Sequence, residues 1–131
     1  MFSLHSASSS RELIFSEKRG EHFQVELKGL EVSAQTDVWV PADMVSLYKF
    51  LQELAGYDKP WQGDKSWGSP DEEFSILARC SVSGTVMFQV QFRGDLGGSD
   101  EWLVRVGLVA GFGQLKQFAQ AADVFFKASN N

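Results

Sequence analysis

The chain contains one cysteine and two histidines among its 131 residues. A single cysteine excludes an intramolecular disulfide and a zinc site built from several cysteines. The lone thiol, Cys80, fits a reducing compartment, so we expect a cytoplasmic protein. Nucleophilic catalysis needs a base beside the nucleophile, and neither His5 near the N-terminus nor His22 on the outer face of an expected strand is well placed for that role.

The chain also lacks an excess of basic residues and any long apolar run. Lysine and arginine number 12 against 17 acidic residues, which gives a net charge of −5, and they form no cluster. We therefore expect no nucleic-acid partner, because phosphate backbones attract basic surfaces. No segment approaches the ~20 apolar residues of a membrane span, and residues 1–10 do not resemble a signal peptide. We expect no membrane association, whereas a basic protein partner is compatible with the charge.

Aromatic residues are abundant. Eleven phenylalanines and four tryptophans indicate a core built around aromatic rings. A length of 131 residues is typical of one domain and allows enough burial for folding without disulfides. The serine-rich start shows no periodicity. We predict a flexible N-terminal arm at residues 1–10 and a single α+β domain at residues 11–128.

Apolar and polar residues alternate in six stretches, which is typical of antiparallel strands with one exposed face. The six stretches are 11–17, 22–27, 32–40, 74–80, 86–92 and 102–108. Apolar residues recur every three or four positions between Pro41 and Gly56 and again from about Gln114, which predicts two helices. The order βββαβββα predicts an antiparallel sheet of about six strands with two helices packed on one face.

The two halves of the chain share a short similarity. Residues 47–52 (LYKFLQ) and 115–120 (LKQFAQ) are identical at three of six positions. This identity indicates either a diverged duplication or chance.

Motifs for catalysis or metal binding are absent, since the chain has no G-x-S-x-G, H-E-x-x-H or P-loop pattern. We therefore expect no catalytic residues, no metal ion and no cofactor. Residues 95–100 (DLGGSD) resemble a calcium loop only superficially, because they lack its alternating oxygen ligands and bidentate glutamate. Cys80 falls on the inward side of its strand, which indicates a small buried hydrophobe.

The segment 57–70 (YDKPWQGDKSWGSP) holds two prolines, two glycines and two tryptophans, and we expect it to be irregular. An exposed indole ringed by charge is typical of a protein interface. We therefore predict a partner-binding surface, and its residues are Trp61, Asp64, Trp67, Asp71, Glu72 and, on a separate strand, Trp39. The alternative is that the indoles fill the end of the core or lie under a loop, and that the acids are solvated turn residues.

From Trp61 onward the chain resembles a family of small, uncharacterised bacterial proteins. The shared pattern is W-x-G-x-x-x-W-x-S (residues 61–69), an acidic pair, alternating strands with a glycine turn, a tryptophan strand and a final helix, and it covers roughly residues 38–127. The family has no assigned catalytic residues. The size, acidity and architecture are similar in style to bacterial immunity proteins, which neutralise secreted toxins.

Our first hypothesis is a non-enzymatic protein-binding domain, and specifically an immunity-type inhibitor that neutralises a basic bacterial toxin by occlusion. The alternative is a small-molecule-binding or regulatory domain with a pocket under the Trp61–Trp67 loop. An enzyme with an unfamiliar carboxylate site is a third alternative.

Overall fold

The structure, a computed structural model, describes residues 1–128, which form eight strands and two helices. The first half comprises β1 (Phe2–His5), β2 (Glu12–Arg19), β3 (His22–Lys28), β4 (Ala34–Trp39) and helix α1 (Leu47–Ala55). The second half comprises β5 (Lys65–Gly68), β6 (Phe74–Cys80), β7 (Thr85–Gly94), β8 (Trp102–Gly111) and helix α2 (Phe112–Ala128). The α+β class is confirmed. Both halves have the order ββββα, as a duplication would produce.

The strands form two antiparallel sheets of four, whereas we predicted a single sheet of about six strands. Sheet A has the order β1-β2-β3-β4, and sheet B has the order β5-β6-β7-β8. The predicted alternation is confirmed within strands, since Phe23, Val25 and Leu27 of β3 are all buried. Alternation shows which side chains share a face, but it does not show whether strands on either side of a helix pair with each other.

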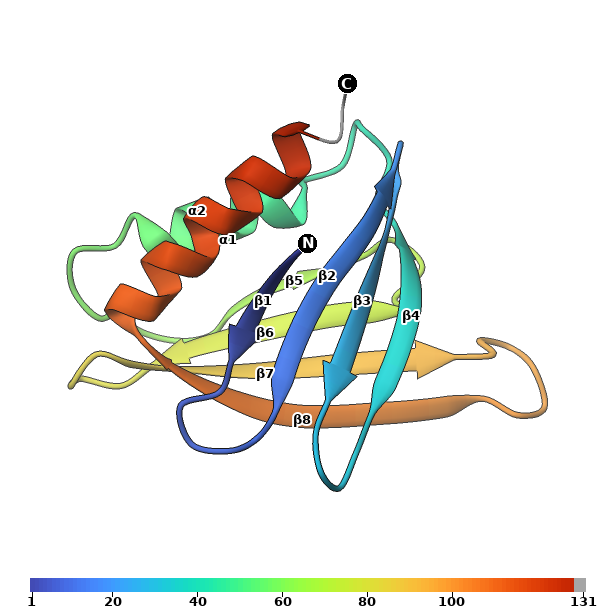
Figure 1. Cartoon of the computed structure of the whole chain (residues 1–131), viewed down its shortest axis with the longest axis horizontal. Helices are drawn as coiled ribbons and strands as arrows, with labels where there is room; N and C mark the ends of the chain where they lie inside the picture. Colours follow the sequence, from blue (N-terminus) through green and yellow to red (C-terminus); the bar gives the residue numbers. More distant parts are fainter. Residues whose placement is uncertain (129–131) are drawn as a thin grey trace.

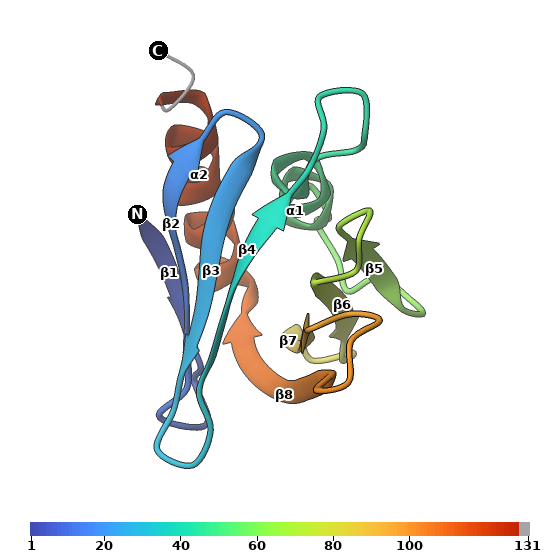
Figure 2. The ribbon, with the colours of Figure 1, turned by 90° about the vertical axis from the view of Figure 1, so that its right-hand side faces the viewer.

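The two sheets and both helices share one hydrophobic core. The strands of sheet A cross those of sheet B steeply, and the helices occupy the space where the sheets diverge (Figures 1 and 2). Strand β4 contacts β7, while α2 contacts β1, β7 and β8. The centre is aromatic: the ring of Phe15 lies 4.6 Å from that of Phe2 and 6.1 Å from that of Phe74 in sheet B.

The prediction of a flexible arm at residues 1–10 is wrong for residues 2–5, which form β1. This strand pairs with β2, and Phe2 lies opposite Phe15 while Leu4 lies opposite Leu13. The side chains of Phe2 and Leu4 are both buried in the core. Two apolar residues in a serine-rich background gave too short a pattern for alternation to be recognised.

Two further local predictions need correction. Helix α1 begins at Leu47 and not at Pro41, because the side-chain oxygen of Ser46 caps it by accepting a hydrogen bond from the Lys49 N–H at 3.1 Å. Gly56 ends this helix as predicted. The segment 57–70 is not wholly irregular, since it contains β5, which pairs with β6.

Helix α2 begins at Phe112, slightly before the predicted start at about Gln114. Leu115, Phe118 and Ala122, which belong to the apolar repeat of this helix, are buried. Within residues 1–128, neither helix combines the length and the apolar character needed to cross a membrane.

Candidate functional site

Both tryptophans of the predicted binding loop are buried in the core. The exposed fraction is 6% for Trp61 and 8% for Trp67. The ring of Trp61 packs against Tyr57 and Phe112, with centroids 5.4 Å and 6.2 Å away. The indole N–H of Trp67 donates a hydrogen bond to the carbonyl of Val45 at 2.8 Å, which ties β5 to the approach of α1. The prediction of an exposed indole in this loop is therefore wrong.

The acids predicted to join these tryptophans lie at opposite ends of β6. Asp64 sits opposite the end of the strand, where Arg79 donates two hydrogen bonds to its carboxylate at 2.7 and 3.1 Å. The guanidinium holds the pKa of Asp64 below its ordinary value. Asp71 and Glu72 precede the start of the strand, roughly 20 Å away at the rise of an extended chain. The structure therefore does not bring the predicted site residues together.

Trp39 lies on the outer face of sheet A, as alternation predicts, and it is half-buried. Its indole N–H donates a hydrogen bond to Glu21 at 3.3 Å, and Glu21 also accepts one from the N–H of Ala42 at 2.8 Å. The indole is thus held against the turn between β2 and β3.

A different tryptophan combines exposed indole surface with acidic neighbours. Trp102 opens β8 and is 39% exposed, and it lies opposite Gly94 in the β7–β8 register. Leu103, the next residue, points to the opposite face of β8 and is 51% exposed, and Leu96 in the preceding loop is 41% exposed. Five carboxylates belong to the same end of sheet B, and we call these residues together the Trp102 surface: Trp102, Leu96, Leu103, Asp71, Glu72, Asp95, Asp100 and Glu101.

Arg93 joins the two acidic segments of the Trp102 surface. Its guanidinium contacts Glu72 of the β5–β6 connection at 3.1 Å and Glu101 of the β7–β8 loop at 2.8 Å. The hydrogen bond from Arg93 is the main cause that lowers the pKa of Glu101, so this carboxylate stays ionised. Asp95 stiffens the same loop by accepting a hydrogen bond from the N–H of Asp100 at 2.8 Å.

A groove of about 640 Å³ continues from the Trp102 surface over the outer face of sheet B. Its lining includes Glu72 and Arg93 at one end and Gln91 and Arg105 further along the sheet. Arg105 donates hydrogen bonds from two guanidinium nitrogens to the side-chain oxygen of Gln91, at 3.0 and 2.6 Å. The surface is therefore hollowed, with polar groups available for hydrogen bonds.

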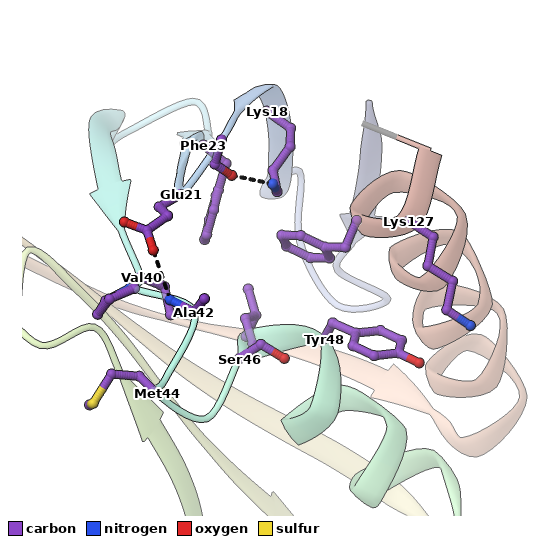
Figure 3. Close-up of a pocket in the computed structure, with 13 residues that line it drawn as sticks. Lys18, Glu21, Phe23, Val40, Ala42, Met44, Ser46, Tyr48 and Lys127 are labelled. Carbon is purple, nitrogen blue, oxygen red and sulfur yellow. Dashed lines mark hydrogen bonds between the residues drawn. The ribbon is translucent and has the colours of Figure 1, made fainter. Parts of the chain in front are cut away.

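A separate pocket of about 430 Å³ lies between the β2–β3 turn, the start of α1 and the end of α2 (Figure 3). Apolar side chains such as Phe23, Val40 and Leu47 line it, together with Tyr48. Lys127 lies at its edge, 2.9 Å from Asp123. This pocket is not under the Trp61–Trp67 loop, where the small-molecule hypothesis placed it.

Cys80 is half-buried against the core, and burial raises the pKa of its thiol. This agrees with the prediction of a small inward hydrophobe. Within the described part of the chain, no group of three or more His, Cys, Asp or Glu side chains is arranged to hold a metal ion.

Sequence reasoning missed Trp102 because alternation assigns it to the inward side of β8. That assignment is right in phase, since Val104, Val106 and Leu108 follow on the same side. However, β8 extends past the end of the core, so its first inward residue meets Gly94 and solvent. The cluster of acids and glycines in residues 94–101 was the available signal that the strand starts outside the core.

A family model described as a family of unknown function (DUF6228) matches residues 5–129. No curated protein and no solved structure matches the chain.

Proposed function

For a chain that belongs to DUF6228, a family of unknown function, we propose the role of a non-enzymatic domain that binds a basic protein partner on the Trp102 surface. The observation that carries this proposal is the exposed indole of Trp102 at the acidic end of sheet B. Exposed aromatic surface of this kind supplies a large share of the affinity at protein interfaces. Trp61 and Trp67 have no place in this surface because they are buried, and Asp64 and Trp39 lie outside it.

The apolar and charged parts of the surface have different effects on binding. Burial of Trp102, Leu103 and Leu96 would stabilise the complex and slow its dissociation. The acids would mainly accelerate association with a basic partner. Arg93, which pairs with Glu72 and Glu101, offsets one of the five carboxylate charges of the Trp102 surface, so the surface stays negative for an approaching partner.

The class of partner that fits best is a basic toxin, which makes the chain an immunity-type inhibitor. Such an inhibitor acts by occlusion: it covers the toxin's working surface and needs no chemistry of its own. The net charge of −5 and the acidic end of sheet B support a basic target. A cytoplasmic location belongs to the same proposal, because an immunity protein of this kind acts where its host must be protected.

The test begins with capture of partners from the native host and their identification by mass spectrometry. A single basic partner is then titrated against wild type, Trp102→Ala and Val82→Ala, since Val82 is also an exposed apolar residue but lies in the turn at the opposite end of sheet B. We expect Trp102→Ala to cost about 2 kcal/mol of binding, roughly thirtyfold, through faster dissociation. Val82→Ala should bind as wild type does. Unchanged binding by a folded Trp102→Ala variant would contradict the proposal.

The second candidate is a small-molecule-binding domain, now favoured by the pocket in Figure 3 and not by a hollow under the loop. The apolar lining suits a small, largely apolar compound. A fragment screen by NMR provides the test. This candidate would be favoured by fragments that shift the amide signals of Phe23 and Leu47. The Ala42→Trp variant should abolish their binding by filling the mouth of the pocket.

A further inference from the structure

Strand β8 is an edge strand of sheet B, since β7 is its neighbour on one side and the sheet order ends with it (Figures 1 and 2). In an antiparallel pair, successive residues point their N–H and C=O groups alternately toward and away from the partner strand. Val109 points both groups away from β7, because its N–H donates to the Ser6 hydroxyl at 3.0 Å and its C=O accepts from Ala7 at 2.7 Å. Because this orientation alternates along the strand, Gly107, Arg105 and Leu103 also point their N–H and C=O groups away from β7.

A second bond confirms this phase. The carbonyl of Gly107 accepts a hydrogen bond from the guanidinium of Arg11 at 3.0 Å, so Gly107 also faces away from β7. The N-terminal segment thus occupies the downstream half of the β8 edge. Upstream of it, among residues 1–128, nothing pairs with the backbone N–H and C=O of Leu103 and Arg105 or with the N–H of Gly107.

We infer that this open stretch of β8, residues 102–107, receives an extended segment of the partner as an added strand. This inference rests on the proposed function and gives it a binding mode. An added strand would complete the hydrogen bonds of Leu103 and Arg105, which is how extended peptides commonly dock on sheet edges. The occupant is a strand with apolar residues at alternate positions and basic residues at its ends.

The added strand needs apolar residues because of the side chains on the inward side of β8. Val104 and Val106 pack against the margin of the core and are only partly buried, and Trp102 is more exposed still. One face of an added strand would lie directly beside these three side chains and extend the core outward. On the other face, the Arg105 side chain leans over Gln91 of β7 and leaves the backbone edge uncovered.

The added strand needs basic residues because acidic residues surround the start of β8. Asp100 and Glu101 directly precede the strand, and Asp95 lies in the same loop. Basic residues at the end of an added strand would reach these carboxylates. A second copy of this chain is the less suitable occupant, because two chains with a net charge of −5 repel each other.

The experiment uses the whole chain and two synthetic peptides in NMR titrations that follow backbone amides. The probe is KKVTVTVKK, and its matched control is KKVPPTVKK, which has the same charge but cannot complete a strand because two adjacent prolines remove N–H groups toward both edges. We expect the probe to shift the amides of Leu103, Arg105 and Gly107, and to bind at least about tenfold more tightly than the control.

A pair of variants tests the protein side. Arg105→Pro removes the outward N–H, whereas Arg105→Ala removes only the side chain, and proline is tolerated at an edge position whose N–H faces solvent. We expect Arg105→Pro to weaken probe binding at least about tenfold relative to Arg105→Ala. Dispersed amide spectra will establish that both variants are folded, and the two peptides test the wild type independently of either.

Three outcomes would overturn the inference. If both peptides shift only residues of the Trp102 surface, and equally, the partner docks through side chains, and the proposed function stands without strand addition. If the β8 amides shift with protein concentration alone, a second copy is the occupant. If neither peptide shifts any amide at millimolar concentration, the edge does not accept a strand of this composition.

Discussion

The indole of Trp102 lies across the backbone of Gly94, its partner in the β7–β8 register. A Cβ atom at residue 94 would meet the indole Nε1 at 2.1 Å, so no other residue type fits beneath the ring as it stands. The glycine therefore lets the ring rest on the strand, and it fixes the orientation of the exposed indole. Through this contact Gly94, which has no side chain, shapes the apolar centre of the Trp102 surface.

Substitution of Gly94 should move the indole without unfolding the chain. We expect Gly94→Ala to displace Trp102, to shift the tryptophan fluorescence, and to weaken binding of an identified partner about as much as Trp102→Ala does. Gly111→Ala is the matched control, because Gly111 lies at the far end of β8 opposite Thr85 and a Cβ there meets nothing within 4 Å. If Gly94→Ala leaves both fluorescence and binding as in wild type, the ring is not held by this contact.

The two buried tryptophans should respond differently to loss of the indole nitrogen. Trp67 donates a hydrogen bond to Val45, whereas the Trp61 nitrogen is buried and finds no hydrogen-bond partner among residues 1–128. We expect Trp67→Phe to destabilise the fold by about 1 kcal/mol more than Trp61→Phe, because only Trp67 loses a hydrogen bond. Urea denaturation of both variants measures the difference, and equal costs would show that the Trp67 bond contributes nothing.

The N-terminal strand should contribute strongly to stability. Phe2 is 5% exposed, and its ring stacks on Phe15 at 4.6 Å. We expect Phe2→Ala to lower the free energy of unfolding by about 3 kcal/mol, because it leaves a cavity in the core. His5→Ala is the control in the same strand, since the His5 side chain is 72% exposed and its loss should change stability by less than about 1 kcal/mol. A small effect of Phe2→Ala would instead support the prediction of a flexible N-terminal arm.

The carboxylate of Glu73 should make stability depend on pH. Burial is the main cause that raises its pKa above the ordinary value of 4.5, and the nearby Asp71 and Asp37 add to the shift. Between that value and the higher pKa of the folded state, the unfolded chain binds fewer protons at this group. The contribution of Glu73 to stability therefore falls as pH rises through this window, and its ionised form opposes folding at pH 7.

Replacement by a neutral isostere should remove this effect. We expect Glu73→Gln to be more stable than wild type at pH 7, by less than about 1 kcal/mol because the group is partly solvated, and the gain should shrink as pH falls through the folded-state pKa toward 4.5. The exposed Glu72, which pairs with Arg93, supplies the control: Glu72→Gln should show no gain at pH 7. The test compares urea denaturation midpoints of the variants and wild type at pH 7 and below pH 4.5. A Glu73→Gln variant less stable than wild type at pH 7 would contradict the prediction.

The sequence was sufficient for the elements whose patterns are long and regular. Strand β6 was predicted with its observed bounds, and the alternating apolar residues of β3 and β7 are all buried, because two-residue periodicity over six or more positions has few alternative explanations. The start of α1 was wrong because Pro41 and Asp43 are good first-turn residues, yet Ser46 caps the helix five residues later.

The candidate site was harder to predict, because it depends on where the core ends. Trp67 and Trp102 are both tryptophans close to acids and glycines in the sequence. The first is covered because α1 and the Val45 carbonyl lie over it, and the second is exposed because β8 overshoots the core. Local patterns do not contain that difference, since it arises from contacts between segments far apart in the chain.

The placement of Ser6, Ala7 and Arg11 on the downstream half of β8 also limits aggregation. A ten-residue edge with free backbone groups would be a template for open-ended stacking of strands from many molecules. By blocking half of that edge, the N-terminal segment leaves room for one short strand in a defined register and excludes a long cross-β ladder. The segment thus protects the molecule from polymerising through the same edge that it leaves open to a partner.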